Sequence, residues 1–549
     1  MSFPLTSLNF ILYALAIYTL TRLLWKFCKR YVLPSPLDNI AGPLPTSIIY
    51  GNLKDLDDPQ LGWKFQEDLA TKWGGVVKLK GVFNGDMLYV FDPVAAHSVL
   101  LKDHLVYESP LFNRSLAQIL FGGGLFAASG NHHRSQRKMM NPLFSIAQMK
   151  SLTPTFTEVA NRLKVAIEHQ VKDGMRELDI LNWFSRVALE LIGRGGLGYS
   201  LDPLIEETSN TLGDTIKRLI PALGGVLSIG ELISSLDFGG SAPTRRRLLG
   251  LLPVKKIQDT LKVIKVLHEE CEDIYIKKKK SFQDGEDTAV HQGGKGIDIM
   301  SVLLKANMMA SEEDRIPENE VIAQMCTLVF AAADTTSSAL TRTLDLLSEA
   351  QEKLREEILN AHSASTSELT YDELVELPYL DAVCRETLRL HAPVPLIFKQ
   401  AVKDTVMPLS EPMIDIHGRP LSQIPIPKGT KVFVGVYASN RNPALWGDDA
   451  SEWKPERWLS PLPKKLTDSR LPGVYSHLLT FSGGGRSCVG FKFSQLEMKV
   501  VLATLIRHFK FSPSKDRHNV FWNHARITSP SIGPGGRQPM MPMNVELVQ

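Results

Sequence analysis

The first hydrophobic feature of the chain is a predominantly apolar run over residues 8–25, with no charged side chain before Arg22. A run of this length can cross a bilayer as one helix. Basic residues follow the run at Lys26, Lys29 and Arg30, whereas a cleaved signal peptide, the alternative, has its basic residues first and a shorter apolar core. The sequence therefore predicts a membrane anchor over residues 1–32, with the remaining chain on the cytosolic side.

The pattern changes after the anchor. Prolines at positions 34, 36 and 43 form a stiff hinge, because proline cannot continue a helix. Short β-type runs follow over residues 75–89, helical periodicity dominates to about residue 390, and further short strands are expected between Lys399 and Val436. A helical pattern from Pro317 to about Ala350 predicts one long helix. Residues 33–549 are thus expected to form one domain, mainly α with small β-sheets.

Charge and cysteine content exclude several classes of protein. The chain has 62 basic and 59 acidic residues, a net charge of +3, which disfavours nucleic acid as a partner. The four-lysine run Lys277–Lys280 and the polar, glycine-rich stretch after it predict a solvated loop between helices; a nucleic-acid patch is the alternative. Five cysteines, at 28, 271, 326, 384 and 488, are scattered without a C-x-x-C pair, which argues against a disulfide scaffold or a structural zinc site.

One of these cysteines lies in an unusual setting. Cys488 belongs to the glycine-dense loop 481–490, directly before a helix-forming run over residues 491–509. Glycines let the backbone approach a bulky planar ligand, and N–H groups at a helix start stabilise a thiolate. The loop suits axial ligation of haem iron, although glycine and cysteine alone are also compatible with an ordinary turn.

The extended pattern is more specific. Five residues match the F-x-x-G-x-R-x-C-x-G loop of the cytochrome P-450 family at every fixed position: Phe481, Gly484, Arg486, Cys488 and Gly490. The chain therefore resembles this family, and other stretches resemble it in the same order over nearly the whole sequence after the anchor. The resemblance implies the cytochrome P-450 fold and haem b as cofactor. It also implies Cys488 as the metal ligand and all five residues as cofactor-binding.

Two short motifs support the same resemblance. Glu386 and Arg389 form an E-x-x-R pair on one face of the helix expected over residues 380–390. Taken alone, such a pair is usually solvated. In the family this motif joins a buried network with the arginine of a P-E-R segment, which is Arg457 here. The resemblance thus gives these three residues a structural role.

The middle of the long helix carries the candidate catalytic residues. The stretch 331–336 interrupts an apolar run with Asp334 and Thr335. Such groups can simply face water or bond their own backbone. The resemblance instead implies the family's oxygen-binding groove, with Asp334 and Thr335 as catalytic residues that relay protons. Ala332 replaces the commoner glycine, which leaves the width of that groove open.

Haem carboxylates need cationic partners when they are partly desolvated. The stretch 130–138 resembles the family's W-x-x-x-R helix, with His133 in place of tryptophan and Arg137 one turn later. Arg486 is a third candidate for the haem edge. Lys399 stands where the family often has arginine, and a lysine there gives a less specific contact.

The substrate-pocket segments of the family correspond to residues 111–126, 392–396 and 527–532. They are mainly apolar, which implies a lipophilic small-molecule substrate, although each side chain could equally be ordinary core. The aromatic and aliphatic candidates in the first segment are Phe112, Ile119, Leu120, Phe121 and Phe126.

The resemblance implies a monooxygenase of the endoplasmic reticulum membrane that uses O2 and an NADPH-cytochrome P-450 reductase. The sequence of residues 481–497 resembles that of fungal microsomal members of the family. This resemblance implies a role in secondary metabolism, with terpenoid tailoring as the favoured pathway. One alternative is a haem-thiolate isomerase or dehydratase that needs no external electrons, although such enzymes commonly lack the pair Asp334 and Thr335. A non-enzymatic haem-binding sensor is the other, and it would need neither a proton relay nor an apolar pocket.

Overall fold

The computed structural model describes residues 34–549 apart from 206–241, 252–253, 285–296, 313–314, 349, 366–367, 534–535, 537 and 549, together with scattered residues between 13 and 32. The predicted anchor over residues 8–25 falls largely outside the described residues. Among the residues that are described, no helix combines the length and the apolar character needed to cross a membrane.

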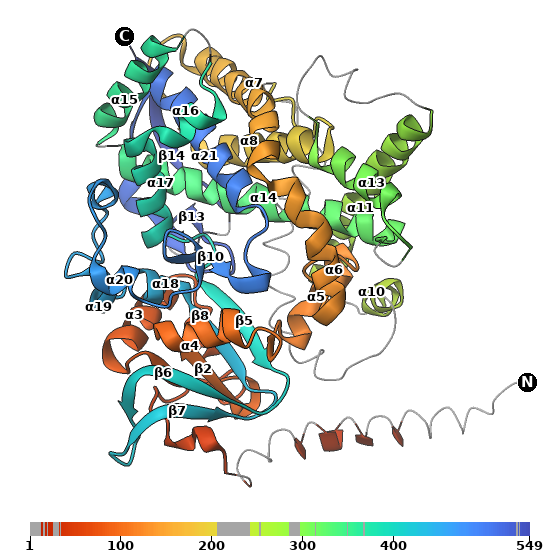
Figure 1. The fold of residues 1–549 in the computed structure, drawn as a ribbon, viewed down its shortest axis with the longest axis vertical. Coiled ribbons are helices and arrows are strands. Elements are labelled where there is room, and N and C mark those ends of the chain that lie inside the picture. Colours follow the sequence, from red (N-terminus) through yellow and green to blue (C-terminus); the bar gives the residue numbers. More distant parts are fainter. Residues whose placement is uncertain are drawn as a thin grey trace, which may run out of the picture.

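A five-stranded sheet lies at one end of the molecule, and helices make up most of the rest (Figure 1). Its strand order is β1-β2-β8-β5-β3, with β2 and β8 parallel and the other neighbours antiparallel. The sheet unites both predicted sets of strands, and the second set begins three residues before Lys399. The strands are β1 (Val76–Lys80), β2 (Asp86–Val90), β3 (Tyr107–Glu108), β5 (Leu396–Ala401) and β8 (Lys431–Gly435).

A long hairpin extends from this end of the molecule (Figure 1). It consists of β6 (Thr405–Ile414) and β7 (Pro420–Ile426). The turn forms because the Asp415 carboxylate accepts hydrogen bonds of 2.8 Å from the backbone N–H groups of His417 and Arg419.

The long helix α14 (Glu318–Leu347) crosses the middle of the molecule (Figure 1). It begins one residue after Pro317, as expected for proline at a helix start. The predicted helix is confirmed, and it ends three residues before Ala350. α14 packs against α8 (Ile180–Leu191), α11 (Lys255–Gln283), α17 (Pro378–Leu390) and α21 (Phe491–His508). It is therefore the axis of the helical part.

The prediction of a solvated loop is wrong for Lys277–Lys280, because these residues form the last turns of α11, while most of the glycine-rich stretch after them, residues 285–296, lies outside the described residues. Successive helical residues point about 100° apart, so a run of four lysines cannot all face water. Lys278 is buried, and its Nζ lies 2.9 Å from both Asp298 Oδ2 and Ser301 Oγ. An inward lysine is tolerated because its charge is paired.

The other described elements complete a mainly helical fold with small sheets, as predicted. Their sheets are β11-β14-β4, β10-β9 and β12-β13. The remaining helices are α2 (Leu53–Leu56), α3 (Gly62–Lys72), α4 (Pro93–His97), α5 (Leu111–Phe121), α6 (Gly130–Met140), α7 (Ile146–Val171), α10 (Ala242–Gly250), α13 (Ile299–Met309), α15 (Gln351–Ala364), α16 (Tyr371–Glu376), α18 (Val436–Asn440), α19 (Pro443–Trp446) and α20 (Lys464–Thr467). The remaining strands are β4 (Arg176–Asp179), β9 (Gly473–Tyr475), β10 (Leu478–Gly483), β11 (Phe509–Pro513), β12 (Val520–Asn523), β13 (Ser529–Ile532) and β14 (Pro542–Leu547).

Candidate functional site

The cysteine loop joins β10 to α21 and folds back on itself. The N–H of Cys488 donates to the Phe481 carbonyl at 2.9 Å, and the N–H of Ser487 donates to the Gly484 carbonyl at 3.1 Å. Gly484 has a φ of +66°, and a Cβ there would lie 2.1 Å from the Leu100 carbonyl oxygen. Only glycine fits this position, so the backbone itself sets where Cys488 stands.

The thiol of Cys488 differs from the other described thiols. Its side chain is exposed, whereas Cys271, Cys326 and Cys384 are buried. Burial nevertheless raises the pKa of the Cys488 thiol, while the Gly490 N–H and the Arg137 guanidinium act to lower it. Both observations hold if the sulfur is accessible but surrounded by protein on most sides. A thiol in such a place can act as a ligand to a metal that enters the protein.

Basic side chains gather beside this loop. Burial lowers the pKa of His133 to about 4, and Arg486 and Arg137 act in the same direction. Burial also lowers the pKa of Lys399 to about 8, again with a contribution from Arg486. These mutual effects place the four groups close together. Glu108 is the nearby acid, and one of its oxygens lies 2.5 Å from Arg486 Nη2.

Arg137 connects this cluster to the cysteine loop directly. Its Nη1 donates to the Ser487 carbonyl at 2.5 Å, and its Nε donates to Asn141 Oδ1 at 2.6 Å. The predicted haem-edge residues His133, Arg137, Arg486 and Lys399 are therefore brought together next to Cys488. The set consists of a thiol donor, a glycine-lined backbone and an excess of positive charge. These features fit haem, which brings an iron that binds thiolate and two carboxylates that need cations.

The candidate catalytic residues lie on α14. Thr335 is half-buried, and its hydroxyl donates to the Ala331 carbonyl at 2.7 Å, the local contact that isolated helical threonines often make. Asp334 borders a cavity of about 130 Å³ together with Asn182 and Ser185 of α8. In the described part of the chain, no hydrogen bond joins Thr335 to Cys488.

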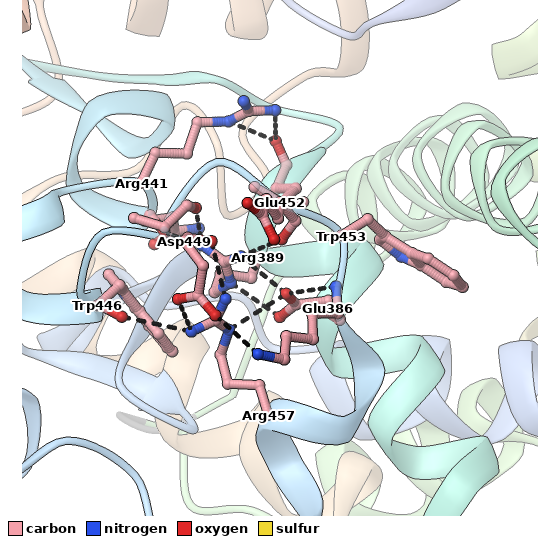
Figure 2. Close-up of polar contacts among 12 residues, drawn as sticks. Glu386, Arg389, Arg441, Trp446, Asp449, Glu452, Trp453 and Arg457 are labelled. Carbon is pink, nitrogen blue, oxygen red and sulfur yellow. Dashed lines mark hydrogen bonds and ion pairs between the residues drawn. The ribbon is translucent and has the colours of Figure 1, made fainter.

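The E-x-x-R pair forms the buried network expected from the resemblance. Figure 2 shows Glu386, Arg389 and Arg457 converging, with Asp449 beside them. Arg389 donates to both Glu386 carboxylate oxygens at 2.8 Å, and Arg457 Nε lies 3.3 Å from Glu386 Oε1. Glu386 and Arg389 are essentially inaccessible to solvent. Arg457 also bonds Asp449 at 2.7 Å.

The three predicted substrate-pocket segments converge on α14. The ring of Phe121 packs at a tilt against that of Phe330 of α14, with centroids 4.8 Å apart, and the Phe126 ring lies 6.2 Å from that of Phe121. The Thr528 N–H donates to the Pro393 carbonyl at 2.9 Å, which ties the other two segments together. Ser338 of α14 donates to the Thr528 carbonyl at 2.7 Å.

Sequence reasoning missed two acids of the site. Glu108 is a lone acid in a two-residue strand, and no local pattern distinguishes it. Glu497 is fully buried on α21 beside Thr336, and burial raises the pKa of its carboxyl well above the usual value. The sequence did contain a signal for Glu497, because an acid interrupts the apolar face of the helix predicted over residues 491–509. An acid in an apolar run is also what drew attention to Asp334.

Comparisons with known proteins agree with this geometry. The cytochrome P450 family model matches residues 41–531. A cytochrome P450 monooxygenase from Postia placenta is 47% identical, with 99% of both chains covered. A ganoderic acid synthetase from Ganoderma lucidum is 41% identical over 95% of this chain and 96% of its own. A crystal structure of a cytochrome P450 superposes with a TM-score of 0.68 at 21% identity, covering 94% of this chain and 100% of that one.

Proposed function

Because this chain belongs to the cytochrome P450 family and is a haem-thiolate monooxygenase, we propose that Cys488 supplies the thiolate that would bind the haem iron. The observation that carries this assignment is the accessible thiol of Cys488 in a glycine loop that sits beside a cluster of cations. We assign the catalytic domain to residues 33–549 and a membrane anchor to residues 1–32.

In this proposal, basic side chains bind the carboxylates at the haem edge. Arg137, Arg486 and Lys399 bind the two haem carboxylates as cations, because these three groups outnumber the neighbouring acid, Glu108. His133, whose pKa burial lowers to about 4, is neutral and contributes a ring N–H hydrogen bond instead. Phe481, Gly484 and Gly490 shape the backbone around the sulfur. Haem held there would supply the oxygen chemistry: electron donation by the thiolate would favour cleavage of O2, and with two electrons from the reductase and two protons one atom would enter the substrate and the other would leave as water.

Asp334 and Thr335 deliver protons during this reaction. Among the described residues, the hydroxyl of Thr335 bonds only to its own helix, so it can rotate without breaking a tertiary contact. Asp334 borders the cavity of about 130 Å³, which has room for water and is lined by Asn182 and Ser185. Water in that cavity can resupply protons to Asp334.

The substrate is a lipophilic small molecule, and a fungal terpenoid is the class we propose. The apolar segments that meet at α14 support the first statement, and the relative from Ganoderma lucidum supports the second. An NADPH-cytochrome P-450 reductase supplies the electrons.

We also propose that the protein acts at the endoplasmic reticulum membrane. Exposed apolar side chains directly follow the hinge at Leu44, Ile48 and Ile49. Ile416 of the hairpin turn is also exposed, and its N–H donates to the Asn39 carbonyl at 3.0 Å. A concentration of exposed apolar residues next to the predicted anchor is compatible with contact to lipid. Deletion of residues 2–30 should shift the protein toward the soluble fraction and keep haem binding; loss of haem from a monodisperse truncated protein would contradict the domain boundary.

The function is tested by reconstitution. The full-length protein is combined with a fungal reductase, NADPH and a panel of terpenoid precursors, and products are identified by mass spectrometry. We expect an oxygenated product whose formation requires both NADPH and O2. Product formation without NADPH would instead favour the isomerase alternative.

A further inference from the structure

A second cavity lies outside the haem-edge cluster and outside the pair Asp334 and Thr335. It has a volume of about 190 Å³ and sits where α3, the C-terminal half of α14, the end of α17, α18 and β12 meet. Since one water needs roughly 10–15 Å³ of such volume, the cavity has room for a small organic group. The side chains that matter here are Trp63, Arg342, His391, Tyr437, Arg441 and Trp522.

The charge of this cavity is one-sided. Arg342 and Arg441 line it, and no Asp or Glu among the described residues does. Asp345 pairs with Arg342 at 3.0 Å, but the same carboxylate also pairs with Arg517 at 3.1 Å. Two guanidinium groups therefore share one carboxylate, and Arg441 adds a further positive charge.

One of the two arginines keeps an unused donor, and the other shares a single acceptor between two donors. Among the described residues, the buried Nε of Arg342 has no hydrogen-bond partner. Arg441 directs Nε and Nη2 to a single acceptor, the Leu390 carbonyl, at 3.1 and 2.8 Å. Figure 2 shows this guanidinium lying apart from the Glu386 and Arg389 pair. A buried guanidinium without enough acceptors is costly unless an anion completes its bonds.

The electrostatic surroundings agree. Burial lowers the pKa of Arg342 to about 10, and Arg441 and Arg517 act in the same direction against Asp345. Burial lowers the pKa of His391 well below its usual value, with Arg342 as the next cause. His391 is therefore neutral, and its ring adds no third charge.

Aromatic rings hold the guanidinium groups in place. Arg342 stacks on Trp522 at 4.5 Å, and Arg441 stacks on Tyr437 at 4.4 Å. Trp63 lies 5.2 Å from Tyr437 and donates its Nε1–H to the Trp522 carbonyl at 2.8 Å. Stacking fixes the planes of the two guanidinium groups, and the paired N–H donors of a planar guanidinium match the two oxygens of a carboxylate.

We propose that this cavity is a carboxylate-binding site, in which Arg342 and Arg441 bind the anion and the rings of Trp63, Tyr437 and Trp522 cover its apolar part. Ala392 and Thr528 also border the cavity, and both belong to segments assigned above to the substrate pocket. A small free acid and the acid end of a lipophilic substrate share this chemistry. If the anion is the acid end of the substrate, the inference rests on the proposed function, and the substrate class is lipophilic carboxylic acids.

The test is calorimetric titration of the full-length, haem-loaded protein with benzoate and with benzamide, its neutral analogue. We expect benzoate to bind at least tenfold more tightly than benzamide. Arg342→Gln should weaken benzoate binding at least tenfold, and Arg342→Lys should lie between, because lysine keeps the charge but loses the fork. Arg186→Gln is the matched control, since Arg186 stacks on Trp183 at 4.7 Å and pairs with Asp202 at 2.9 Å away from this cavity.

Each outcome decides the inference separately from the proposed function. Equal affinity for benzoate and benzamide, or equal weakening by Arg342→Gln and Arg186→Gln, would overturn it, even in protein with a normal haem-thiolate spectrum. The benzoate comparison in the parent stands if a variant fails to fold. Dodecanoate and its neutral analogue dodecanol then separate the two sources of the anion. If dodecanoate, but not dodecanol, displaces benzoate and shifts the haem absorption, the site binds the acid end of a substrate. If benzoate binds but dodecanoate neither displaces it nor shifts the haem absorption, the site binds a small free acid. Displacement by inorganic phosphate at the same concentration as benzoate would contradict selectivity for carboxylate.

Discussion

The cysteine loop and the Glu386 network lie close together but are held by different forces. Backbone geometry holds the loop, through the left-handed Gly484 and the bond from the Cys488 N–H to the Phe481 carbonyl. Buried charge holds the network, in which Glu386 pairs with Arg389 and Arg457, and Asp449 supplies the second negative charge at Arg457. The loop should therefore be sensitive to added atoms, and the network to a removed charge.

The two regions are also physically linked. Arg389 donates to the Asn440 carbonyl at 3.0 Å, and the Asn440 side chain donates to Thr480 Oγ1 at 2.9 Å. Thr480 belongs to β10, the strand that leads into the cysteine loop. The network thus anchors the base of the loop, and this link can be tested by damaging each region in turn.

The largest effect on stability should come from Glu386→Gln. Loss of the carboxylate leaves the Arg389 guanidinium buried without a counter-charge, which typically costs about 3–5 kcal/mol. We expect a strongly lowered Tm and little haem-loaded protein. Glu456→Gln is the control, because Glu456 forms an exposed pair with Lys353 and should change the free energy of unfolding by less than about 1 kcal/mol. Similar losses in both variants would refute the charged-network account.

Gly484→Ala should cause the second largest loss of stability. The new Cβ must occupy a left-handed conformation, at a cost of about 1–2 kcal/mol, and it also meets the Leu100 carbonyl oxygen. The control is Gly418→Ala, at a φ of +79°, where an added methyl group would have no atom within 4 Å. Chemical denaturation should show a larger loss for Gly484→Ala, and equal losses would mean that the loop shifts freely.

Thr335→Ala should leave stability and haem binding almost unchanged but lower the ratio of product formed to NADPH oxidised, with peroxide released instead. Thr335→Ser should retain more of the ratio because it keeps the hydroxyl. Thr343→Ala is the matched control, since Thr343 makes the same contact with its own helix, to the Ala339 carbonyl at 2.8 Å. An unchanged ratio in Thr335→Ala would reduce Thr335 to a packing residue.

Of the three variants that should lower the free energy of unfolding, Asp449→Asn, at the partly exposed edge of the network, should lower it least. Arg457 lowers the pKa of Asp449 to about 2, so the carboxylate is charged at all ordinary pH values. A lowered pKa stabilises the fold above the unfolded value near 3.8, and this stabilisation is lost as the pH falls toward 2. We expect a loss of about 0.5–1 kcal/mol that stays constant between about pH 6 and 8. A difference that varies over this range would point to another titrating group.

The sequence was informative where backbone geometry limits the residue type. Gly484 was recognised by its match to the family's cysteine loop, and the structure gives the reason for the match, because only glycine fits its conformation. The helix α14 was predicted because Pro317 and an apolar periodicity mark its start. Lys277–Lys280 was misjudged because charge alone does not say which helical position points inward. The cavity of Arg342 and Arg441 was not predicted: two of its bordering residues, Ala392 and Thr528, lie in segments assigned to the substrate pocket, but no local pattern around Arg342 or Arg441 indicates that the two arginines meet there.

The central claim is that Cys488 is the axial ligand, and the absorption spectrum of the ferrous carbon monoxide complex tests it most directly. The parent protein should show the red-shifted Soret band of thiolate-ligated haem, because thiolate is a strong electron donor. Cys488→Ala should lose this band and turnover, whereas Cys271→Ala, Cys326→Ala and Cys384→Ala should keep both. A histidine-type band in the intact parent, or a thiolate-type band that survives in Cys488→Ala, would contradict the account.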